Sequence, residues 1–160
     1  MQRSRTMLTL AFAGIAALTL SVASMAEDGK AKKAELKCPV SGQPASKDHA
    51  VDYKKGQVYF CCPNCPKAFT KDSAKFATKA NHQLVQSGQY VAAKCPISGQ
   101  PLNPEHTLKV SDVEVTFCCP NCKGKVAGME SEEQKLEAVF AEKPFEKGFQ
   151  KKEKKDKNPA

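Results

Sequence analysis

Short segments in which apolar and polar residues alternate predict a β-hairpin in the first half of the chain. Residues 50–53 and 57–60 alternate in this way, and the Lys-Lys-Gly sequence of residues 54–56 supplies a turn between them. In the second half, the turn pair Ser111-Asp112 marks a second hairpin of the same kind. Residues 89–93 form one more predicted strand.

Helical patterns appear in three places. Residues 65–69 continue from Pro63, which suits the first turn of a helix, and residues 74–80 follow the capping pair Asp72-Ser73. Residues 130–142 begin with acidic side chains and carry an apolar stripe made of Met129, Leu136, Val139 and Phe140. We therefore expect a small α+β fold in which a C-terminal helix covers the core.

The first 26 residues have the layout of a secretory signal peptide. Arg3 and Arg5 give a basic start, residues 7–23 are uncharged and apolar, and small residues lead up to Ala26. We expect cleavage after Ala26 and an extracytoplasmic protein, periplasmic or secreted, without stable membrane insertion afterwards. The uncharged stretch is also long enough to span a bilayer, so an uncleaved N-terminal anchor is the alternative.

The chain contains two copies of one cysteine-rich sequence, 57 residues apart. Residues 38–65 and 95–122 are identical at fourteen of 28 positions; each copy begins Cys-Pro-x-Ser-Gly-Gln-Pro and ends Phe-Cys-Cys-Pro-Asn-Cys. All eight cysteines of the chain fall in these copies, and His49 and His106 occupy equivalent positions. Cysteines and a histidine were thus retained together while other positions diverged.

The repeats divide the chain into five parts. The signal peptide, residues 1–26, is followed by a flexible leader, residues 27–37, and by the first repeat, residues 38–88. The second repeat with its C-terminal helix covers residues 89–142, and the Lys-rich residues 143–160 are typical of a disordered tail. Because the connection between the repeats is short, we expect them to pack against each other.

The formal net charge of +8 is a weak argument for nucleic-acid binding. Much of the charge lies in the Lys-rich tail, and the only two arginines, Arg3 and Arg5, lie in the signal segment. Phosphate recognition usually depends on arginine forks. We therefore expect no nucleic-acid partner.

The cysteines are spaced as ligands of a metal ion. A repeat of this size needs a metal or crosslinks for stability, and a metal can join elements that share few contacts. A turn, a strand end and a helix start each supply one thiolate: Cys38, Cys61 and Cys65 in the first repeat, and Cys95, Cys118 and Cys122 in the second. The fourth ligand is either Cys62 (Cys119), which reaches the same ion only if the chain bends at Pro63, or His49 (His106).

Sulfur ligands restrict the choice of ion. Thiolate-rich sites suit Zn(II) in tetrahedral geometry and Cu(I) in trigonal or linear geometry, whereas ions that prefer carboxylates are excluded. We expect about one Zn(II) or Cu(I) ion per repeat. A site of three cysteines without a fourth ligand would favour the soft monovalent ion and easier exchange.

These motifs resemble a known family. Cys-Pro-Val-Ser-Gly at Cys38, then Val-Tyr-Phe-Cys-Cys-Pro-Asn-Cys at residues 58–65 with Phe69 and Phe76 behind it, is similar to the TRASH and YHS group of small treble-clef-like metal-binding domains. The resemblance implies two tandem treble-clef-like repeats, each with a cysteine turn, a β-hairpin and a short helix. It also implies a role in copper or zinc sequestration, sensing or delivery, with a metal transporter or acceptor protein as a partner.

Two positions depart from that family pattern. Ser41 and Ser98 stand where related treble-clef members carry a second knuckle cysteine, which leaves the fourth ligand open. The second repeat has Val126 where the first has the aromatic Phe69, so we expect weaker packing of its helix.

Two other interpretations of the cysteines stay open. An even number of cysteines in an exported protein is typical of a disulfide framework, which would make the chain a disulfide-stabilised interaction module. Cys62-Pro-Asn-Cys65 and Cys119-Pro-Asn-Cys122 also resemble thiol-disulfide oxidoreductase motifs, but no βαβ pattern surrounds them. No other catalytic set is present, so we expect a protein that is not an enzyme. His82, in a polar stretch, is expected to be exposed.

Overall fold

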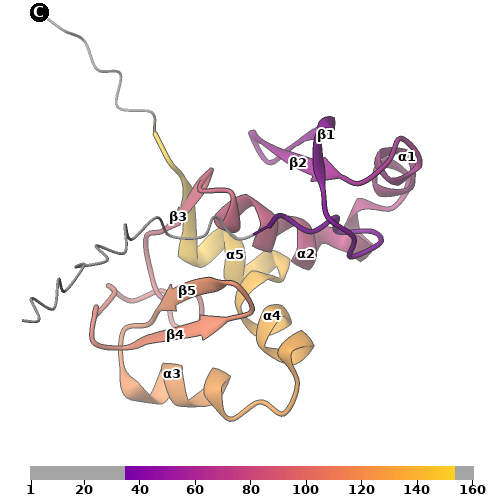
Figure 1. Cartoon of the computed structure of the whole chain (residues 1–160). Helices are drawn as coiled ribbons and strands as arrows, with labels where there is room; N and C mark the ends of the chain where they lie inside the picture. Colours follow the sequence, from indigo (N-terminus) through magenta and orange to yellow (C-terminus); the bar gives the residue numbers. More distant parts are fainter. Residues whose placement is uncertain (1–34, 154–160) are drawn as a thin grey trace, which may run out of the picture. The chain divides into compact units, whose positions relative to one another are not determined.

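The computed structural model describes residues 35–153 and has a small mixed α+β fold (Figure 1). The predicted signal peptide, most of the predicted leader and residues 154–160 lie outside the described residues. Strands pair as three two-stranded antiparallel sheets, β1–β2, β4–β5 and β3–β6. The elements are, in order, β1 (Ser46–Tyr53), β2 (Gly56–Phe60), α1 (Asn64–Lys71), α2 (Ser73–Gln86), β3 (Tyr90–Ala92), β4 (Thr107–Val110), β5 (Val113–Thr116), α3 (Pro120–Ala127), α4 (Glu132–Phe140), α5 (Glu142–Gly148) and β6 (Phe149–Lys151).

Both predicted hairpins form. Lys54 and Lys55 connect β1 to β2 with positive φ values of 47° and 61°, and Ser111 at the second turn has a φ of 54°. Left-handed residues at a tight turn match the twist of the two strands that it joins. The strand that precedes each cysteine pair then turns alternate side chains into the core, where four of them are fully buried: Val58, Phe60, Val115 and Phe117.

Helix α1 begins at Asn64, directly after Pro63, as the sequence predicted, and α3 of the second repeat begins at Pro120. The predicted helix of residues 74–80 is real but longer, because α2 continues to Gln86. Asp72 caps α2 by accepting a hydrogen bond from the backbone amide of Lys75. Leu84 and the polar Gln83 are both fully buried, so the polar second half of α2 faces the protein interior.

The expectation that His82 is exposed is wrong. Its side chain is half-buried on α2, and its ring lies edge-on to the ring of Phe140 with the centroids 5.0 Å apart. The Nε2 atom is buried without a hydrogen-bond partner among the described residues. His82 is half-buried because α4 covers this side of α2. The polar residues around it in the sequence gave no sign of that contact.

Acid should therefore destabilise the protein through His82. Burial lowers the pKa of His82 to about 4, with nearby Asp112 opposing and Lys37 reinforcing the shift, whereas an unfolded histidine has a pKa of about 6.5. The unfolded chain then binds the extra proton first, so stability is lost as pH falls from about 6.5 to 4, by about 3 kcal/mol in total. Urea denaturation at pH 7.5 and pH 5 checks this. The His82→Leu variant should lose less stability between the two pH values than the parent chain, and an equal loss would contradict the prediction.

The end of the chain is more ordered than predicted. Residues 143–153 were expected to belong to a disordered tail, and this is wrong, because they form most of α5 and all of β6, which pairs antiparallel with β3. The reason is aromatic packing: Phe145 and Phe149 are buried and stack on each other with ring centroids 5.4 Å apart. The lysines of this segment lie on its exposed side, and their number hid the two buried aromatic residues in the sequence.

Removing one of these rings should be costly. Phe149 is 6% exposed and stacks on both Phe140 and Phe145, so Phe149→Ala is expected to lower the free energy of unfolding by about 3–5 kcal/mol. The neighbouring exposed Gln150 provides the control, and Gln150→Ala should change stability by less than about 0.5 kcal/mol. Urea denaturation of both variants is the measurement. A tail that contributes nothing would leave the two variants equally stable.

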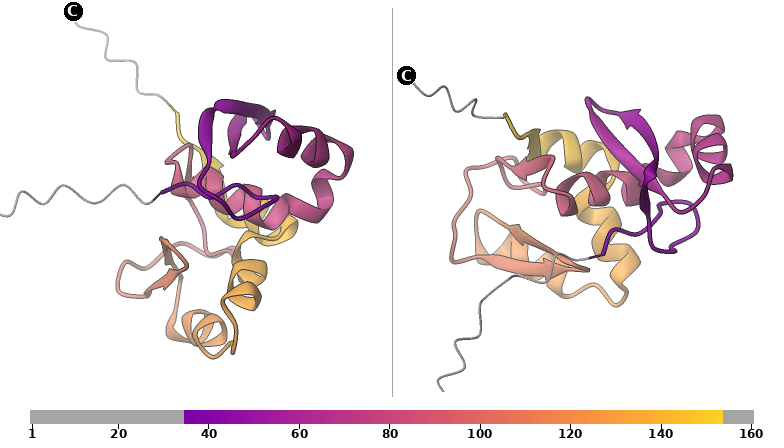
Figure 2. Two further views of the ribbon diagram at one scale, coloured as in Figure 1. Left: turned by 45° about the vertical axis from the view of Figure 1, so that its right-hand side comes forward. Right: turned by 45° about the horizontal axis from the view of Figure 1, so that its top comes forward.

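The two repeats share one hydrophobic core. Buried residues of both repeats, from Cys38 to Phe149, form a single cluster. Helix α2 of the first repeat packs on α4 (Figure 2), and the Asn81 side chain donates a hydrogen bond to the backbone carbonyl of Phe140 at 2.9 Å. The expected packing of one repeat against the other is thus observed. Among the described helices, none is both long enough and apolar enough to cross a bilayer.

Candidate metal centre

The first cysteine of each repeat lies at the start of a tight turn. The backbone amide of Cys38 donates to the carbonyl of Gln43 at 2.7 Å, and the amide of Gly42 donates to the carbonyl of Cys38 at 2.8 Å. Gly42 adopts a φ of +75°, which a side chain would strain. Cys95 and Gly99 make the same turn in the second repeat. The turn directs the first cysteine inward, and both Cys38 and Cys95 are at most 1% exposed.

A strand end and a helix start position the other two cysteines of each repeat. In the first repeat, Cys61 comes directly after β2 and Cys65 lies in the first turn of α1. Phe60 and Phe69 hold these elements together, since their rings pack with centroids 5.3 Å apart. In the second repeat Val126 takes the place of Phe69 and is likewise fully buried. The predicted geometry of turn, strand end and helix start is therefore present twice.

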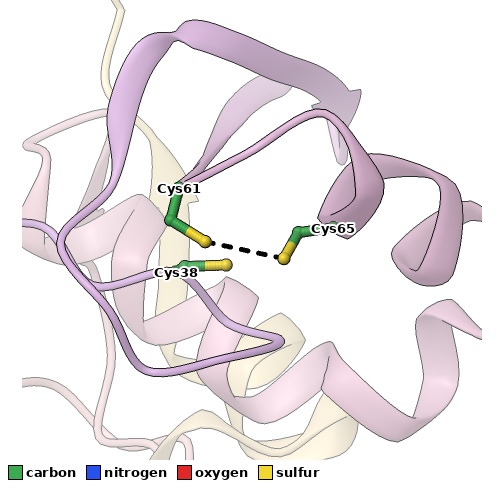
Figure 3. Close-up of side chains that lie close together, drawn as sticks. All are labelled: Cys38, Cys61 and Cys65. Carbon is green, nitrogen blue, oxygen red and sulfur yellow. Dashed lines mark hydrogen bonds between the residues drawn. The ribbon is translucent and has the colours of Figure 1, made fainter.

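The sulfurs of these cysteines converge on one point in each repeat. The Sγ atoms of Cys38, Cys61 and Cys65 all lie within 4.8 Å of one another, and the Cys61 and Cys65 sulfurs are 3.6 Å apart (Figure 3). The second triad, Cys95, Cys118 and Cys122, meets the same limit, with 3.7 Å between the Cys118 and Cys122 sulfurs. These two triads are called the first site and the second site.

The sulfur spacing fits a thiolate-bound metal ion. With metal–sulfur bonds of about 2.3 Å, sulfurs are about 3.8 Å apart around a tetrahedral ion and about 4.0 Å apart around a trigonal one. The observed separations of 3.6 and 3.7 Å agree with both arrangements. All eight cysteines are free thiols, and a disulfide would require sulfurs about 2.05 Å apart. Each triad can thus bind one soft cation.

A serine hydroxyl contacts each triad, which the sequence alone had not indicated. Ser41 Oγ lies 3.2 Å from Cys61 Sγ, and Ser98 Oγ lies 3.1 Å from Cys118 Sγ. In each turn a backbone amide two residues further on, at Gln43 or Gln100, donates to the serine oxygen at 3.3 Å. The serine oxygen and the sulfur are within hydrogen-bonding distance, and either of them can be the donor. The signal was present in the sequence, because both repeats keep serine at the position three residues after the first cysteine.

The turn also stabilises negative charge on the first cysteine. Burial raises the pKa of the Cys38 thiol, but hydrogen bonds from the Ser41 hydroxyl and from nearby backbone amides outweigh burial and bring the pKa down to about 7. The pKa of Cys95 falls to about 6 in the same way, with Ser98 as the donor. Burial raises the pKa of Cys65, as do its thiol neighbours. Each triad therefore ionises readily at one thiol, and a bound cation would displace the remaining protons.

The candidate fourth ligands lie outside the triads. Cys62 Sγ is 3.5 Å from Cys65 Sγ, so the chain does bend at the strand end, but Cys62 is not within 4.8 Å of all three triad sulfurs. Cys119 Sγ is 3.6 Å from Cys118 Sγ and is likewise outside its triad. The structure does not bring His49 or His106 into either triad.

Gln83 positions the first site. No sequence pattern had indicated this role. Its buried side chain donates to the carbonyl of Lys37 at 2.9 Å and to the carbonyl of Tyr59 at 2.8 Å, and it accepts from the amide of Tyr59 at 2.7 Å. Lys37 directly precedes Cys38, and Tyr59 lies two residues before Cys61. One amide group from α2 thus ties two of the three ligand-bearing segments together.

A Gln83→Met substitution should affect one site and not the other. It leaves three partly buried backbone groups without their side-chain partner, which is expected to lower the free energy of unfolding by about 1–3 kcal/mol. Because such supporting contacts tune metal sites, affinity at the first site should fall about 10- to 100-fold. The second site has no equivalent contact among the described residues and serves as an internal control. Metal titration of the folded variant checks this, and equal affinity losses at both sites would contradict the prediction.

Other contacts hold the second site. The backbone amides of Ala93 and Lys94 both donate to the carbonyl of Gly148, at 2.8 and 3.0 Å. Gly148 lies so close to Pro96 that a Cβ atom there would be 2.8 Å from the Pro96 Cα atom. The cysteine turn of the second repeat therefore rests on the end of α5, within the segment that was predicted to be a tail.

Comparison of the chain with protein-family models, with curated proteins and with solved structures found no match. The two cysteine triads are compatible with a cysteine-rich metal-binding domain.

Proposed function

We propose that this chain is an extracytoplasmic protein that binds one soft metal ion in each repeat and sequesters it, senses it or passes it on. The observation that carries the proposal is the convergence of three sulfurs, from a turn, a strand end and a helix start, at equivalent places in both repeats. A protein stabilised by disulfides would have no need for the same three-sulfur geometry twice. Thiolate donors of this kind bind Cu(I) and Zn(II).

Cu(I) is the ion that these sites favour. Three sulfurs complete a trigonal Cu(I) site, whereas Zn(II) in structural sites takes four protein ligands. A serine hydroxyl contacts the strand-end sulfur of each triad, and no fourth sulfur lies within 4.8 Å of all three triad sulfurs. Zn(II) is the alternative cargo if Cys62 and Cys119 move in as fourth ligands.

The wider assignment follows from the sequence. The cysteine spacing supports membership of the TRASH and YHS group, the N-terminal 26 residues support export with cleavage after Ala26, and the absence of any catalytic motif supports a protein that is not an enzyme. A metal transporter or an acceptor protein is the corresponding partner. Together, these features support a metal carrier or metal sensor that acts outside the cytoplasm.

Metal titration of the full chain under anaerobic conditions tests the proposal. We expect native mass spectrometry to detect two Cu(I) ions per chain, and competition with a chromogenic chelator to show that Cu(I) displaces Zn(II). A parallel count of free thiols separates the rival interpretations. Four disulfides and no bound ion would overturn the proposal in favour of a disulfide-stabilised interaction module.

A thiol-disulfide oxidoreductase is the second candidate, and the 3.5 Å between the sulfurs of Cys62 and Cys65 favours it. This function predicts catalysed reduction of insulin by the thiol form of the chain. The activity should disappear in Cys62→Ala or Cys119→Ala. Insulin reduction at the uncatalysed rate rejects this candidate.

A further inference from the structure

Each triad consists of two buried cysteines and one half-buried cysteine, with a spare thiol beside it. Two sulfurs of each triad belong to buried residues: Cys38 and Cys65 in the first site, and Cys95 and Cys122 in the second. The third sulfur, of Cys61 or Cys118, is engaged by a serine hydroxyl. Cys62 and Cys119 are half-buried, and each lies beside its triad, Cys62 in contact with Cys65 and Cys119 in contact with Cys118. They are the two cysteines of the chain outside the triads.

The spare thiols are not placed as permanent fourth ligands. A fourth sulfur on a tetrahedral ion lies about 3.8 Å from each of the other three, but Cys62 and Cys119 do not meet even the 4.8 Å limit that the triads meet. Each of them is nevertheless in contact with a triad sulfur, since Cys62 Sγ lies 3.5 Å from Cys65 Sγ and Cys119 Sγ lies 3.6 Å from Cys118 Sγ.

We propose that Cys62 and Cys119 are exchange thiols, through which a bound ion leaves its triad for a thiol-bearing acceptor protein. This inference rests on the proposed function, because it concerns the same ion. It adds the route by which the ion is transferred and the chemistry of the partner that receives it.

The exchange is a ligand substitution without electron transfer. In the first site the bond from the ion to Cys65 Sγ breaks as a bond to Cys62 Sγ forms, and the proton of the Cys62 thiol passes to the Cys65 sulfur. In the second site Cys119 replaces Cys118 in the same way. A thiolate of the acceptor then binds the ion, and further substitutions free it from the chain. Cu(I) stays in one oxidation state throughout.

The surface beside each exchange thiol identifies the kind of acceptor. Helix α1, which follows Cys62, carries Lys67 and Lys71 and no acidic residue, and α3, which follows Cys119, carries Lys123 and Lys125 and no acidic residue. Three of these lysines are exposed and Lys123 is half-buried. Positive charge of this kind attracts a partner of opposite sign and speeds their encounter. The acceptor is thus a protein with paired cysteines inside an acidic surface.

Alkylation of the Cu(I)-loaded chain tests the position of the spare thiols. Under anaerobic conditions, iodoacetamide should modify Cys62 and Cys119 at least about ten times faster than the six triad cysteines, as judged by peptide mass spectrometry. Protection of all eight cysteines at similar rates would identify Cys62 and Cys119 as ligands and overturn the proposal.

Transfer kinetics test the exchange itself. The double variant Cys62→Ser/Cys119→Ser should keep its Cu(I) affinity within about threefold, because it retains both triads. Its rate of transfer to a synthetic Cys-x-x-Cys peptide flanked by glutamates should fall at least about tenfold. Each single variant, which keeps one intact repeat, should lose only one of two transfer phases. A 100-fold loss of affinity, or an unchanged transfer rate, overturns the proposal.

The acceptor chemistry has its own control. Transfer from the parent chain to the glutamate-flanked peptide should be at least about tenfold faster at low salt than transfer to a lysine-flanked peptide of the same length. Equal transfer rates to the two peptides would overturn the inference that the acceptor has an acidic surface. Failure of the parent chain to bind two Cu(I) ions overturns the proposed function, whereas binding with unaffected transfer in the double variant overturns only this inference.

Discussion

Replacing Cys38 by alanine is expected to abolish binding of one of the two proposed metal ions. Cys38 is 1% exposed and contributes one of the three sulfurs of the first site, so its loss leaves two thiolates and a gap on the buried side of the ion. Supporting residues around metal sites typically account for 10- to 100-fold in affinity, and a direct ligand should exceed this, so we expect a loss of more than about 1,000-fold. Anaerobic titration with Cu(I), followed by native mass spectrometry, should then find one ion per chain.

The repeat itself provides the matched control. Cys95→Ala should remove the ion of the second site and leave the first, and the double variant should bind neither ion. Circular dichroism must show that each variant retains its secondary structure, because both cysteines also contribute to the shared core. Two ions bound by Cys38→Ala at parental affinity would contradict the geometry of the first site. One ion bound by the parent chain would show that the triads are not equivalent.

The arrangement of the triads was predictable from the sequence because local features determine each ligand position. The turn that holds Cys38 is encoded by a proline and by Gly42 within four residues of it, and the strand that ends before Cys61 is encoded by alternation and a two-residue turn. Pro63 predicts the start of the helix that carries Cys65. Because each ligand lies at an element boundary with its own local signal, the spacing of the cysteines was sufficient to predict their convergence.

Long-range contacts were the part that the sequence did not reveal. Strands β3 and β6 pair across some sixty residues, and the exposed polar side chains of β6 give no sign of a partner. Phe145 and Phe149 lie among lysines, so average composition predicted a tail although the two aromatic rings are buried. Gln83 presents the converse case, since a polar residue is buried because it satisfies backbone groups of two other segments. Burial of this kind depends on what the tertiary structure places opposite a residue.

Given the proposed preference for Cu(I), changing Ser41 and Ser98 to cysteine should shift both sites toward Zn(II). Ser41 Oγ is 3.2 Å from Cys61 Sγ and belongs to the turn that holds Cys38, so a sulfur at this position would lie against the existing ligands. Four thiolates make a closed tetrahedral Zn(II) site. For Ser41→Cys/Ser98→Cys we expect Zn(II) affinity to rise at least about 100-fold while Cu(I) affinity changes by less than about tenfold. Competition titrations with metal-specific chelators measure both.

The variant Ser41→Ala/Ser98→Ala is the control that distinguishes the effect of adding a sulfur from the effect of losing the hydroxyl. Alanine removes the hydrogen bonds to Cys61 and Cys118 without adding a ligand, so Zn(II) affinity should not rise, and Cu(I) affinity should fall by about tenfold as a charge-stabilising donor is lost. If the cysteine variant binds Zn(II) no more tightly than the parent chain, the serine does not occupy a ligand position. The sites would then owe their preference to Cys62 and Cys119. An increase confined to the cysteine variant would instead mean that a single oxygen-for-sulfur exchange at the turn decides which ion each repeat binds.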